Sequence, residues 1–381
     1  MYDVTILVRV MWPGGPQRIA VCETESLREA GFNVNLTFIR STNRDAEWLH
    51  KTQSNIIFDV SANKRTLQKL FYMLTKHFNN GRGKDATVDL DLIALYEIQK
   101  NYSKVVIYYD QFTALFSILR KVRKPFKKVV FIHETSFREK SFLKKTIERI
   151  ALLDSDLIIT NSEFNREVLL KHGYKNVELL YPGIEVKKEY KEFDERNNTC
   201  VVVTVFEKWR KPELLLDIAS CLKQAKIIMA GQWADDDYRR SIEEEINQRN
   251  LQNRIRITGL ITERELINIY ECAKVSLRFG FDEHGPGMGS LESIGFGIPI
   301  IVNTGIGIVE LLQKYNYDLI FSDTDIQGIS ETIDKLTVDR AFWNKYHDSI
   351  TSIAHKNSWN IHNDKLCSLI RQLSEDDVSI N

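Results

Sequence analysis

Residues 281–302 combine two carboxylates, a glycine cluster and an apolar run in an order that suits an anion-binding site. Glu283 precedes the glycines and Glu292 follows them. Glycines let backbone N–H groups come close to a ligand, and a helix that starts near Met288 would direct its unpaired amides at a phosphate. Glu292, about one turn into that helix, suits the hydroxyls of a sugar. The simpler interpretation is a flexible strand-to-helix turn, because short glycine patterns also arise by chance.

The same segment resembles the signature of the retaining nucleotide-sugar glycosyltransferases of glycosyltransferase family 4. That signature has two Glu residues with seven residues between them, followed by a small residue, Gly and Pro. Here Glu292, Gly297 and Pro299 match. The position of the first Glu holds His284, with Glu283 one step earlier. Either His284 replaces that Glu or a one-residue insertion keeps Glu283 in its role, and we favour the insertion because a loop absorbs an extra residue easily.

Other segments resemble further parts of this family, in the family's order. They correspond to an opening glycine loop, a strand that ends in His, the end of the first domain, a basic loop with its helix, and two strands that lead to the base pocket. No single segment is specific, but their order and spacing together are. They cover residues 12–18, 129–133, 158–162, 208–216, 227–231 and 255–260.

The resemblance implies an α/β fold of the GT-B class, with two Rossmann-like parallel-sheet domains facing a central cleft. It implies transfer of a sugar from a nucleotide-sugar donor, a UDP- or GDP-sugar, to an acceptor hydroxyl with retention of anomeric configuration. Neither an essential metal nor another cofactor is expected. The sequence agrees, because no Asp-x-Asp motif ends a strand: Asp235 follows a glycine loop and is expected to cap the next helix.

The resemblance also implies roles for individual residues. Glu292 is expected to bind the ribose hydroxyls, and Glu283 the donor sugar or its developing charge. His133 is expected beside the sugar, and Arg210 with Lys211 on the leaving diphosphate. The other expected donor-binding residues belong to the glycine loops and the basic loop: Gly14, Gly15, Lys208, Gly259, Leu260, His284, Gly285, Gly287 and Met288.

These residue types also have purely structural explanations. A Lys/Arg cluster at a helix start is usually solvated, a Glu near a helix N-terminus is favourable in itself, and Gly14 with Gly15 suits a tight turn. The basic loop nevertheless follows the first strand of the second domain, at the sheet edge where ligands of open α/β sheets bind. The family more often has its Arg upstream, where this chain has Val205 and Phe206. Which cation does which job therefore stays open.

Two other classes of function stay open. One is another enzyme of the same fold, such as a sugar-nucleotide epimerase or a phosphorylase. The other is a non-catalytic sugar-nucleotide-binding protein, which the altered first Glu position makes conceivable. A dinucleotide-dependent dehydrogenase fits less well, because the Gly-x-Gly-x-Gly pattern from Gly285 lies late in the chain and no acidic residue follows a paired strand.

Short apolar runs rich in β-branched residues alternate with amphipathic helices along the chain. Runs without alternation indicate strands buried on both faces, and hence parallel sheets covered by helices. The highly charged stretch 185–198 separates two sets of strands and is interpreted as a linker. Strands are predicted at residues 4–10, 33–38, 56–60, 105–109, 129–133, 157–160, 201–205, 226–230, 254–258, 275–278, 298–302 and 318–321.

The expected domains are therefore residues 1–185, on the acceptor side, and residues 186–359, which would bind the nucleotide-sugar. The resemblance implies that the last helix, within residues 360–381, returns to the first domain. A length of 381 residues suits two such cores, and 43% hydrophobic with 27% charged residues is typical of a globular protein.

Three features bear on the expected location. No apolar run reaches the roughly 18 residues of a membrane span, and residues 1–8 look like a first strand without the basic start of a signal peptide. The five cysteines have no metal-ligand spacing, so buried and reduced thiols are expected. A cytoplasmic protein is the prediction.

Basic and aromatic side chains gather in residues 120–149, where eleven Lys and Arg accompany three acidic residues. Such a mixture suits an anionic membrane surface, where each cation contributes about 1 kcal/mol. Peripheral contact with the inner face of the membrane is therefore expected, with a glycan, lipid-linked or protein acceptor. Solvated ends of core helices are the alternative. Nucleic acid is not an expected partner, because no recognised binding motif accompanies the charge. The aromatic residues that accompany these cations are Phe116, just before the segment, and Phe126, Phe137 and Phe142 within it.

Overall fold

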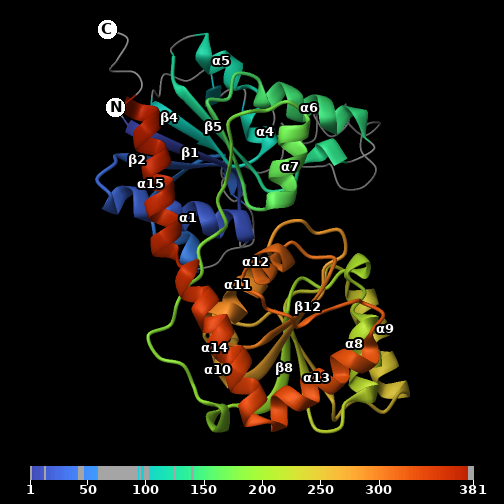
Figure 1. Ribbon diagram of the computed structural model, residues 1–381. Helices are drawn as coiled ribbons and strands as arrows, with labels where there is room; N and C mark the ends of the chain where they lie inside the picture. Colours follow the sequence, from blue (N-terminus) through green and yellow to red (C-terminus); the bar gives the residue numbers. More distant parts are fainter. Residues whose placement is uncertain are drawn as a thin grey trace. The chain divides into compact units, whose positions relative to one another are not determined.

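The chain forms two compact α/β units in the computed structural model (Figure 1). The first unit consists of Met1–Pro182 together with His362–Asn381, and the second of Gly183–Ile361. Each has a parallel sheet, which confirms the predicted fold class. The structure describes residues 2–12, 14–41, 47–58, 93, 96–97, 103–122, 125–138 and 141–375.

A seven-stranded parallel sheet forms the centre of the first unit in its described part. The strand order is β3-β2-β1-β4-β5-β6-β7. The central strand β1 is buried on both faces from Val4 to Val8, as an apolar run without alternation predicts. The strands are β1 (Tyr2–Met11), β2 (Val34–Ser41), β3 (Ser54–Phe58), β4 (Ser103–Tyr108), β5 (Lys127–Ile132), β6 (Leu157–Thr160) and β7 (Val177–Leu179).

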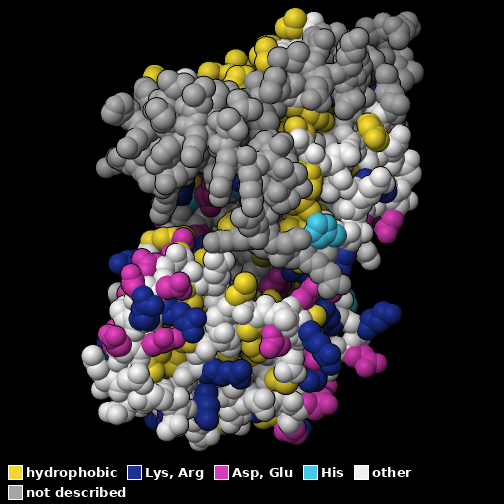
Figure 2. All heavy atoms as spheres, turned by 180° about the vertical axis from the view of Figure 1, so that it is seen from behind, with side chains coloured by type: hydrophobic (Ala, Val, Ile, Leu, Met, Phe, Trp, Pro, Cys, Tyr) yellow, Lys and Arg dark blue, Asp and Glu magenta, His cyan; other side chains and the backbone are white. Residues whose placement is uncertain are grey.

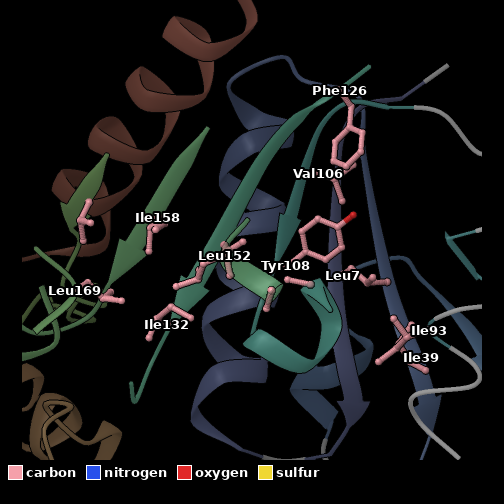
Figure 3. Packing of buried hydrophobic residues seen from close by; sticks show 14 of the residues in the cluster. Leu7, Ile39, Ile93, Val106, Tyr108, Phe126, Ile132, Leu152, Ile158 and Leu169 are labelled. Atoms are coloured by element: carbon pink, nitrogen blue, oxygen red, sulfur yellow. The ribbon is translucent and has the colours of Figure 1, made fainter. Parts of the chain in front are cut away.

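Helices pack on this sheet through a buried apolar cluster, shown in Figure 3. Val106 and Ile132 contribute from neighbouring strands, and Leu152 and Leu169 contribute from two helices. Packing of this kind supplies most of the stability of a helix in a small unit. The helices are α1 (Gly15–Glu29), α4 (Gln111–Ala114), α5 (Ser117–Lys121), α6 (Phe142–Leu152), α7 (Glu163–Lys171) and α15 (Trp359–Glu375).

Helix α15 is joined to the first unit by polar contacts. The two ring nitrogens of His362 lie 2.9 Å from Glu23 Oε1, on α1, and 2.7 Å from the carbonyl oxygen of Tyr181. Lys365 Nζ donates to the carbonyl of Leu179 at 2.7 Å. Buried apolar side chains of the same helix accompany these contacts, so the end of the chain is an integral part of the first unit. They are Leu366 and Ile370.

The second unit contains a six-stranded parallel sheet in the order β10-β9-β8-β11-β12-β13. After β8 the chain adds β9 and β10 on one side, and then returns to add β11 on the other. The carboxyl ends of β8 and β11 therefore form a topological switch point, where open α/β sheets bind ligands. The strands are β8 (Asn197–Val203), β9 (Lys226–Ala230), β10 (Ile255–Gly259), β11 (Ala273–Arg278), β12 (Ile300–Asn303) and β13 (Ile320–Phe321).

The helices of the second unit begin with local signals that the sequence provides. Asp235 accepts hydrogen bonds from two backbone N–H groups and caps α9, as predicted. Among all described helices, none is both long enough and apolar enough to cross a membrane. The helices are α8 (Glu213–Cys221), α9 (Asp236–Gln248), α10 (Glu263–Cys272), α11 (Met288–Gly295), α12 (Ile308–Lys314), α13 (Ile326–Val338) and α14 (Arg340–Lys356).

Two expectations from the sequence are wrong. The charged stretch 185–198 is not a free linker, because it packs on the second unit: Phe193 is buried against Trp343, and Arg196 donates to the carbonyl oxygens of Ala273 and Phe296. Most of its charged side chains face the solvent on one side of the segment, and the other side is buried. Not all thiols are buried either, because Cys221 is exposed at the end of α8.

Candidate functional site

The loop after β8 brings Arg210 back to the end of its own strand. Phe206 stacks on Trp233 with ring centroids 4.8 Å apart, which fixes the first part of this loop. A short 3-10 helix, Lys208–Arg210, follows, and Lys211 then adopts a left-handed conformation with φ 48°. Arg210 Nη1 donates to Thr204 Oγ1, next to β8. The predicted basic loop is therefore present at the sheet edge.

The loop after β11 places Glu283 at the same edge. Gly280 lies so close to Ile306 that a Cβ atom at this glycine would be 2.6 Å from Ile306 Cβ. Asn303 exchanges two hydrogen bonds with the backbone of Gly280, at 2.9 and 2.8 Å. The backbone N–H of Glu283 donates to the carbonyl of Gly305 at 3.2 Å. The Glu283 loop is thus fastened to the loop that follows β12.

The carboxylate of Glu283 lies between two arginines. Arg278 Nη2 donates to Glu283 Oε2 at 2.7 Å, and Arg210 Nη2 lies 3.4 Å from Glu283 Oε1. Arg278 is the last residue of β11 and only 5% exposed. Burial lowers its pKa to about 10, while Glu283 opposes this shift. Arg278 therefore remains charged at neutral pH, and the cluster of two arginines and one glutamate carries a net positive charge.

Glu292 lies in the helix that starts beside this cluster. Helix α11 begins at Met288, as predicted, after Gly287 with φ 71°. A Cβ atom added at Gly287 would be 3.8 Å from Arg278 Nε, so the start of α11 adjoins the cluster. Glu292 Oε2 accepts a hydrogen bond from Tyr270 OH at 3.0 Å. The N-terminus of α11 thus adjoins Arg278 at the switch point.

His284 and its neighbour Glu283 make different contacts. His284 Nε2 lies 3.0 Å from Asp282 Oδ1, whereas Glu283 contacts the arginines. Lys211 Nζ lies 4.2 Å from the ring centroid of Phe281 and 3.4 Å from Asp323 Oδ2. Of the two candidates for the first acidic position, the neighbour of the arginines is therefore Glu283.

The remaining predicted residues of the second unit belong to the ends of its strands or to the loops that follow them. Lys208 Nζ is 5.3 Å from the ring of Tyr238 on α9. Gly259 ends β10 with φ 69°, and the adjacent Leu260 is 80% exposed. Gly285 belongs to the loop between Glu283 and α11. On the face of the second unit seen in Figure 2, cations and carboxylates are interspersed.

Three predicted residues belong to the first unit. Gly14 caps α1 and leaves room for the side chains of Trp12 and Gln17, because a Cβ atom there would be 2.6 Å from each. Gly15 is the first residue of α1. The nearby side chains of Trp12 and Gln17 account for Gly14 within the first unit.

His133 follows directly after β5, as predicted. Its ring stacks on Phe131 with centroids 5.8 Å apart and lies 5.9 Å from the ring of Tyr109. Its Nε2 atom is buried without a hydrogen-bond partner in the described part of the chain. Burial lowers the pKa of His133 to about 4, and the charge of Asp110 opposes this only in part. The imidazole is therefore neutral at physiological pH.

Sequence reasoning missed Arg278 and Tyr270. Arg278 is one of two cations in a strand whose six residues are all buried, and it stands at the carboxyl end. Tyr270 is the buried residue of the amphipathic helix α10. The signal that could have identified Arg278 is a cation in a strand predicted to be buried, directly before a predicted loop site. Within the described residues, no group of three His, Cys, Asp or Glu side chains is arranged to hold a metal ion.

The basic segment 120–149 is only partly a surface feature. Arg120 is buried and pairs with Glu97 at 2.7 Å, and Lys128 Nζ donates to the carbonyl of Leu153 at 2.9 Å. These two cations and two of the aromatic residues, Phe126 and Phe137, therefore belong to the core of the first unit. Residues 123–124 and 139–140 lie outside the described residues.

Several solved structures share the fold of this chain. HepE of Anabaena, solved in complex with UDP and glucose, is similar with a TM-score of 0.74 and 13% identity, over 98% of this chain and 100% of that chain. Sucrose-phosphate synthase of Thermosynechococcus elongatus has a TM-score of 0.72 and 16% identity, over 98% and 99%. WaaG, a glycosyltransferase involved in lipopolysaccharide biosynthesis, has 0.68 and 13%, over 96% and 99%. The chain has the GT-B fold.

A family model covers the unit that carries the cluster. Residues 184–356 match the family described as glycosyl transferases group 1. No curated protein matches the chain. The match covers most of the second unit, which contains Arg210, Glu283 and Glu292.

Proposed function

We propose that this protein transfers a sugar from a UDP- or GDP-sugar to an acceptor hydroxyl with retention of configuration, as its resemblance to glycosyltransferase family 4 implies. The observation that carries the proposal is the pairing of Arg210 with Glu283 at the switch point of the second sheet, beside the start of α11. The group 1 match supports the reaction class. HepE, solved with UDP-glucose, supports the donor class.

The positive charges suit the leaving group. As the bond between the anomeric carbon and the diphosphate breaks, negative charge develops on the diphosphate and positive charge on the sugar ring. Arg210, Lys211 and the amides at the start of α11 would stabilise the diphosphate, so the proposed reaction needs no metal. The acceptor oxygen bonds to the anomeric carbon from the face that the diphosphate leaves, and its proton passes to the diphosphate.

The two carboxylates take different parts in this proposal. Glu283 would contact the donor sugar, where its charge is most useful as the ring becomes positive. Glu292 would accept hydrogen bonds from the ribose, with Tyr270 holding one of its oxygens. The place of Glu283 among the arginines, and of His284 beside Asp282, supports the insertion over the replacement by His.

The other proposed contacts follow the family resemblance. Gly259 and Leu260 would line the base pocket, with Lys208 nearby, and the loop through Gly285 would approach the phosphates. Gly14, Gly15 and His133 would serve the donor sugar and the acceptor from the first unit. The neutral imidazole of His133 suits a hydrogen bond to a sugar hydroxyl, because its Nε2 has no partner in the described part of the chain.

A thermal-shift screen with UDP-, GDP- and ADP-sugars tests the proposal. A ligand that binds only the folded protein stabilises it by about 2.7 kcal/mol at one hundred times its Kd. We expect one nucleotide series to raise the melting temperature, and slow release of free sugar and nucleoside diphosphate from the same donor. A binding protein would be stabilised without releasing sugar, and an epimerase would isomerise the donor. The proposal fails if no nucleotide sugar stabilises the protein.

We also propose that the first unit contacts an anionic membrane on the cytoplasmic side, where a lipid-linked acceptor would be presented. Lys121 Nζ donates to the carbonyl of Asp154 at 2.6 Å, so the ends of α5 and α6 meet. The two helices and the residues after them carry exposed apolar side chains, and α6 also carries the exposed Lys144 and Arg149, which together would form one binding surface. We call it the α5–α6 surface; its apolar residues are Ile118, Leu119, Val122, Phe142, Leu143, Ile150 and Leu153.

A further inference from the structure

Arg278 makes the shortest contact of Glu283. Its Nη2 donates to Oε2 of Glu283 at 2.7 Å, and its Nη1 donates to the carbonyl oxygen of Phe279. Arg278 is 5% exposed; its bond to Phe279 is buried, and its bond to Glu283 is partly buried. A planar guanidinium that is bound at two points has little freedom to rotate. One oxygen of Glu283 is therefore held in place by the strand end itself.

The other oxygen of Glu283 is differently placed. Oε1 is buried and makes no hydrogen bond within the described part of the chain, and its cationic neighbour Arg210 lies 3.4 Å away. Arg210 Nε is also buried without a hydrogen-bond partner among the described residues. Buried polar atoms nearly always find partners. Two such atoms on facing side chains mark the place that a polar ligand would complete.

We propose that Arg278 is a positioning residue, which holds Glu283 through Oε2 so that Oε1 stays available to the ligand. Arg210 then exchanges partners: it contacts Oε1 in the free protein and the diphosphate when the donor is bound. The inference rests on the proposed function, because it takes a nucleotide sugar as the ligand. Without Arg278, Glu283 would turn to Arg210, and both groups would be withdrawn from the donor.

The first test measures slow hydrolysis of the donor that stabilises the protein most in the screen. For Arg278→Met we expect kcat to fall about tenfold or more and KM to change less than about threefold, since the contact of Glu283 strengthens in the transition state. Arg278→Lys keeps a cation beside Oε2 and should recover most of this loss. A kcat for Arg278→Met within about twofold of the wild type would overturn the proposal.

Arg196 offers a matched control. It is also a buried arginine of the second unit, 5% exposed, but its guanidinium donates to backbone carbonyl oxygens and not to Glu283. Arg196→Met therefore reports the general cost of truncating a buried arginine. We expect it to lower the melting temperature while kcat stays within about twofold of the wild type. A fall in kcat equal to that of Arg278→Met would mean that loss of packing explains both, and would overturn the proposal.

A double-mutant cycle separates an effect through Glu283 from a direct one. In a Glu283→Gln background, Arg278→Met should lower kcat by less than about twofold, because the group that it positions is already altered. An unchanged effect in that background would show that Arg278 acts independently, and would refute the positioning role.

The wild type, Arg278→Met, Glu283→Gln and the double variant also distinguish a failure of this inference from a failure of the proposed function. If the wild type neither binds nor hydrolyses any nucleotide sugar, the proposed function fails. The pairing of Arg278 with Glu283 is then tested by urea unfolding of the same proteins. If the unfolding midpoint of the double variant shifts by the sum of the two single-variant shifts, the pairing is overturned. A shift that differs from this sum would support it.

Discussion

Glu292 is the residue whose expected role depends most directly on its place in a helix. Its carboxylate lies one turn into α11, and one oxygen accepts from Tyr270 OH. We predict that Glu292→Ala lowers nucleotide-sugar affinity by about 1.5 to 3 kcal/mol, the usual cost of removing a charged hydrogen-bonding partner. Calorimetric titration of the donor measures this. Tyr270→Phe, which keeps the carboxylate, should cost less, and an unchanged affinity for Glu292→Ala would disprove the ribose assignment.

Glu283 and His284 are neighbours with different surroundings, and their variants should differ accordingly. Glu283→Gln should cut turnover by at least about tenfold with little change in donor binding, because the contact is stronger in the transition state than in the ground state. His284→Ala, which removes the contact with Asp282 and leaves Glu283 between its arginines, should do less. Steady-state kinetics on both variants decide between them, and the reverse ranking would mean that His284 fills the first acidic position.

His133 should make the first unit sensitive to acid. Its pKa is lowered by burial from 6.5 to about 4. Between these values the unfolded chain binds a proton that the folded chain does not, so stability falls as the pH falls through this window. The unfolding free energy of the wild type should fall as the pH is lowered from 6.5 to about 4.5. We predict that this fall is smaller by about 2 kcal/mol in His133→Asn. Urea unfolding at several pH values measures this, and the exposed His355→Asn should behave like the wild type.

At the scale of helices, α6 tests the membrane proposal. Phe142 is 78% and Leu143 67% exposed at its start, with the exposed Lys144 and Arg149 on the same helix. Replacing Phe142 and Leu143 with Ser should reduce binding to anionic vesicles at least about threefold, since buried apolar area and charge act together. Co-sedimentation at rising salt measures it, and a Phe137→Leu variant, altered in the core, is the control. Equal retention by neutral and anionic vesicles would contradict the proposal.

Strands were the part of the fold that the sequence predicted best, because a buried parallel strand needs a continuous apolar run. Every predicted run overlaps a strand of the structure. Strand β7 was missed, since its three residues, Val-Glu-Leu, are too short and polar for such a run. The packing of stretch 185–198 was missed as well. Burial of Phe193 depends on Trp343, which lies far along the chain, and charge density alone hides this contact.

The candidate site could be predicted only in part. Glycines, the start of α11 and the two carboxylates carry local signals, so their loop was found from the sequence. Arg278 was not, because a lone cation at a strand end is usually solvated, and only the topology shows that β11 adjoins β8. The contact of Arg210 with Glu283 likewise joins residues of two separate loops.

At the scale of the whole molecule, the C-terminal helix is expected to decide the stability of one unit alone. Ending the chain at Ile361 removes the buried Leu366 and Ile370 and leaves Glu23 buried without His362. Each apolar side chain contributes about 1.5 to 3 kcal/mol, so the first unit should become sensitive to protease. The second unit, which lacks none of its residues, should stay resistant. Limited proteolysis with mass spectrometry distinguishes them, and a chain that ends at Glu375 is the control.

The first unit is built from segments on both sides of the second unit in the sequence, and this has a consequence for its biosynthesis. The residues from His362 onward are synthesised after every strand of the two described sheets. Units fold as their sequences become complete. The second unit, although it is made later than the strands of the first, can therefore close before its neighbour does. Until the residues from His362 onward emerge, a nascent chain holds the sheet of the first unit without α15.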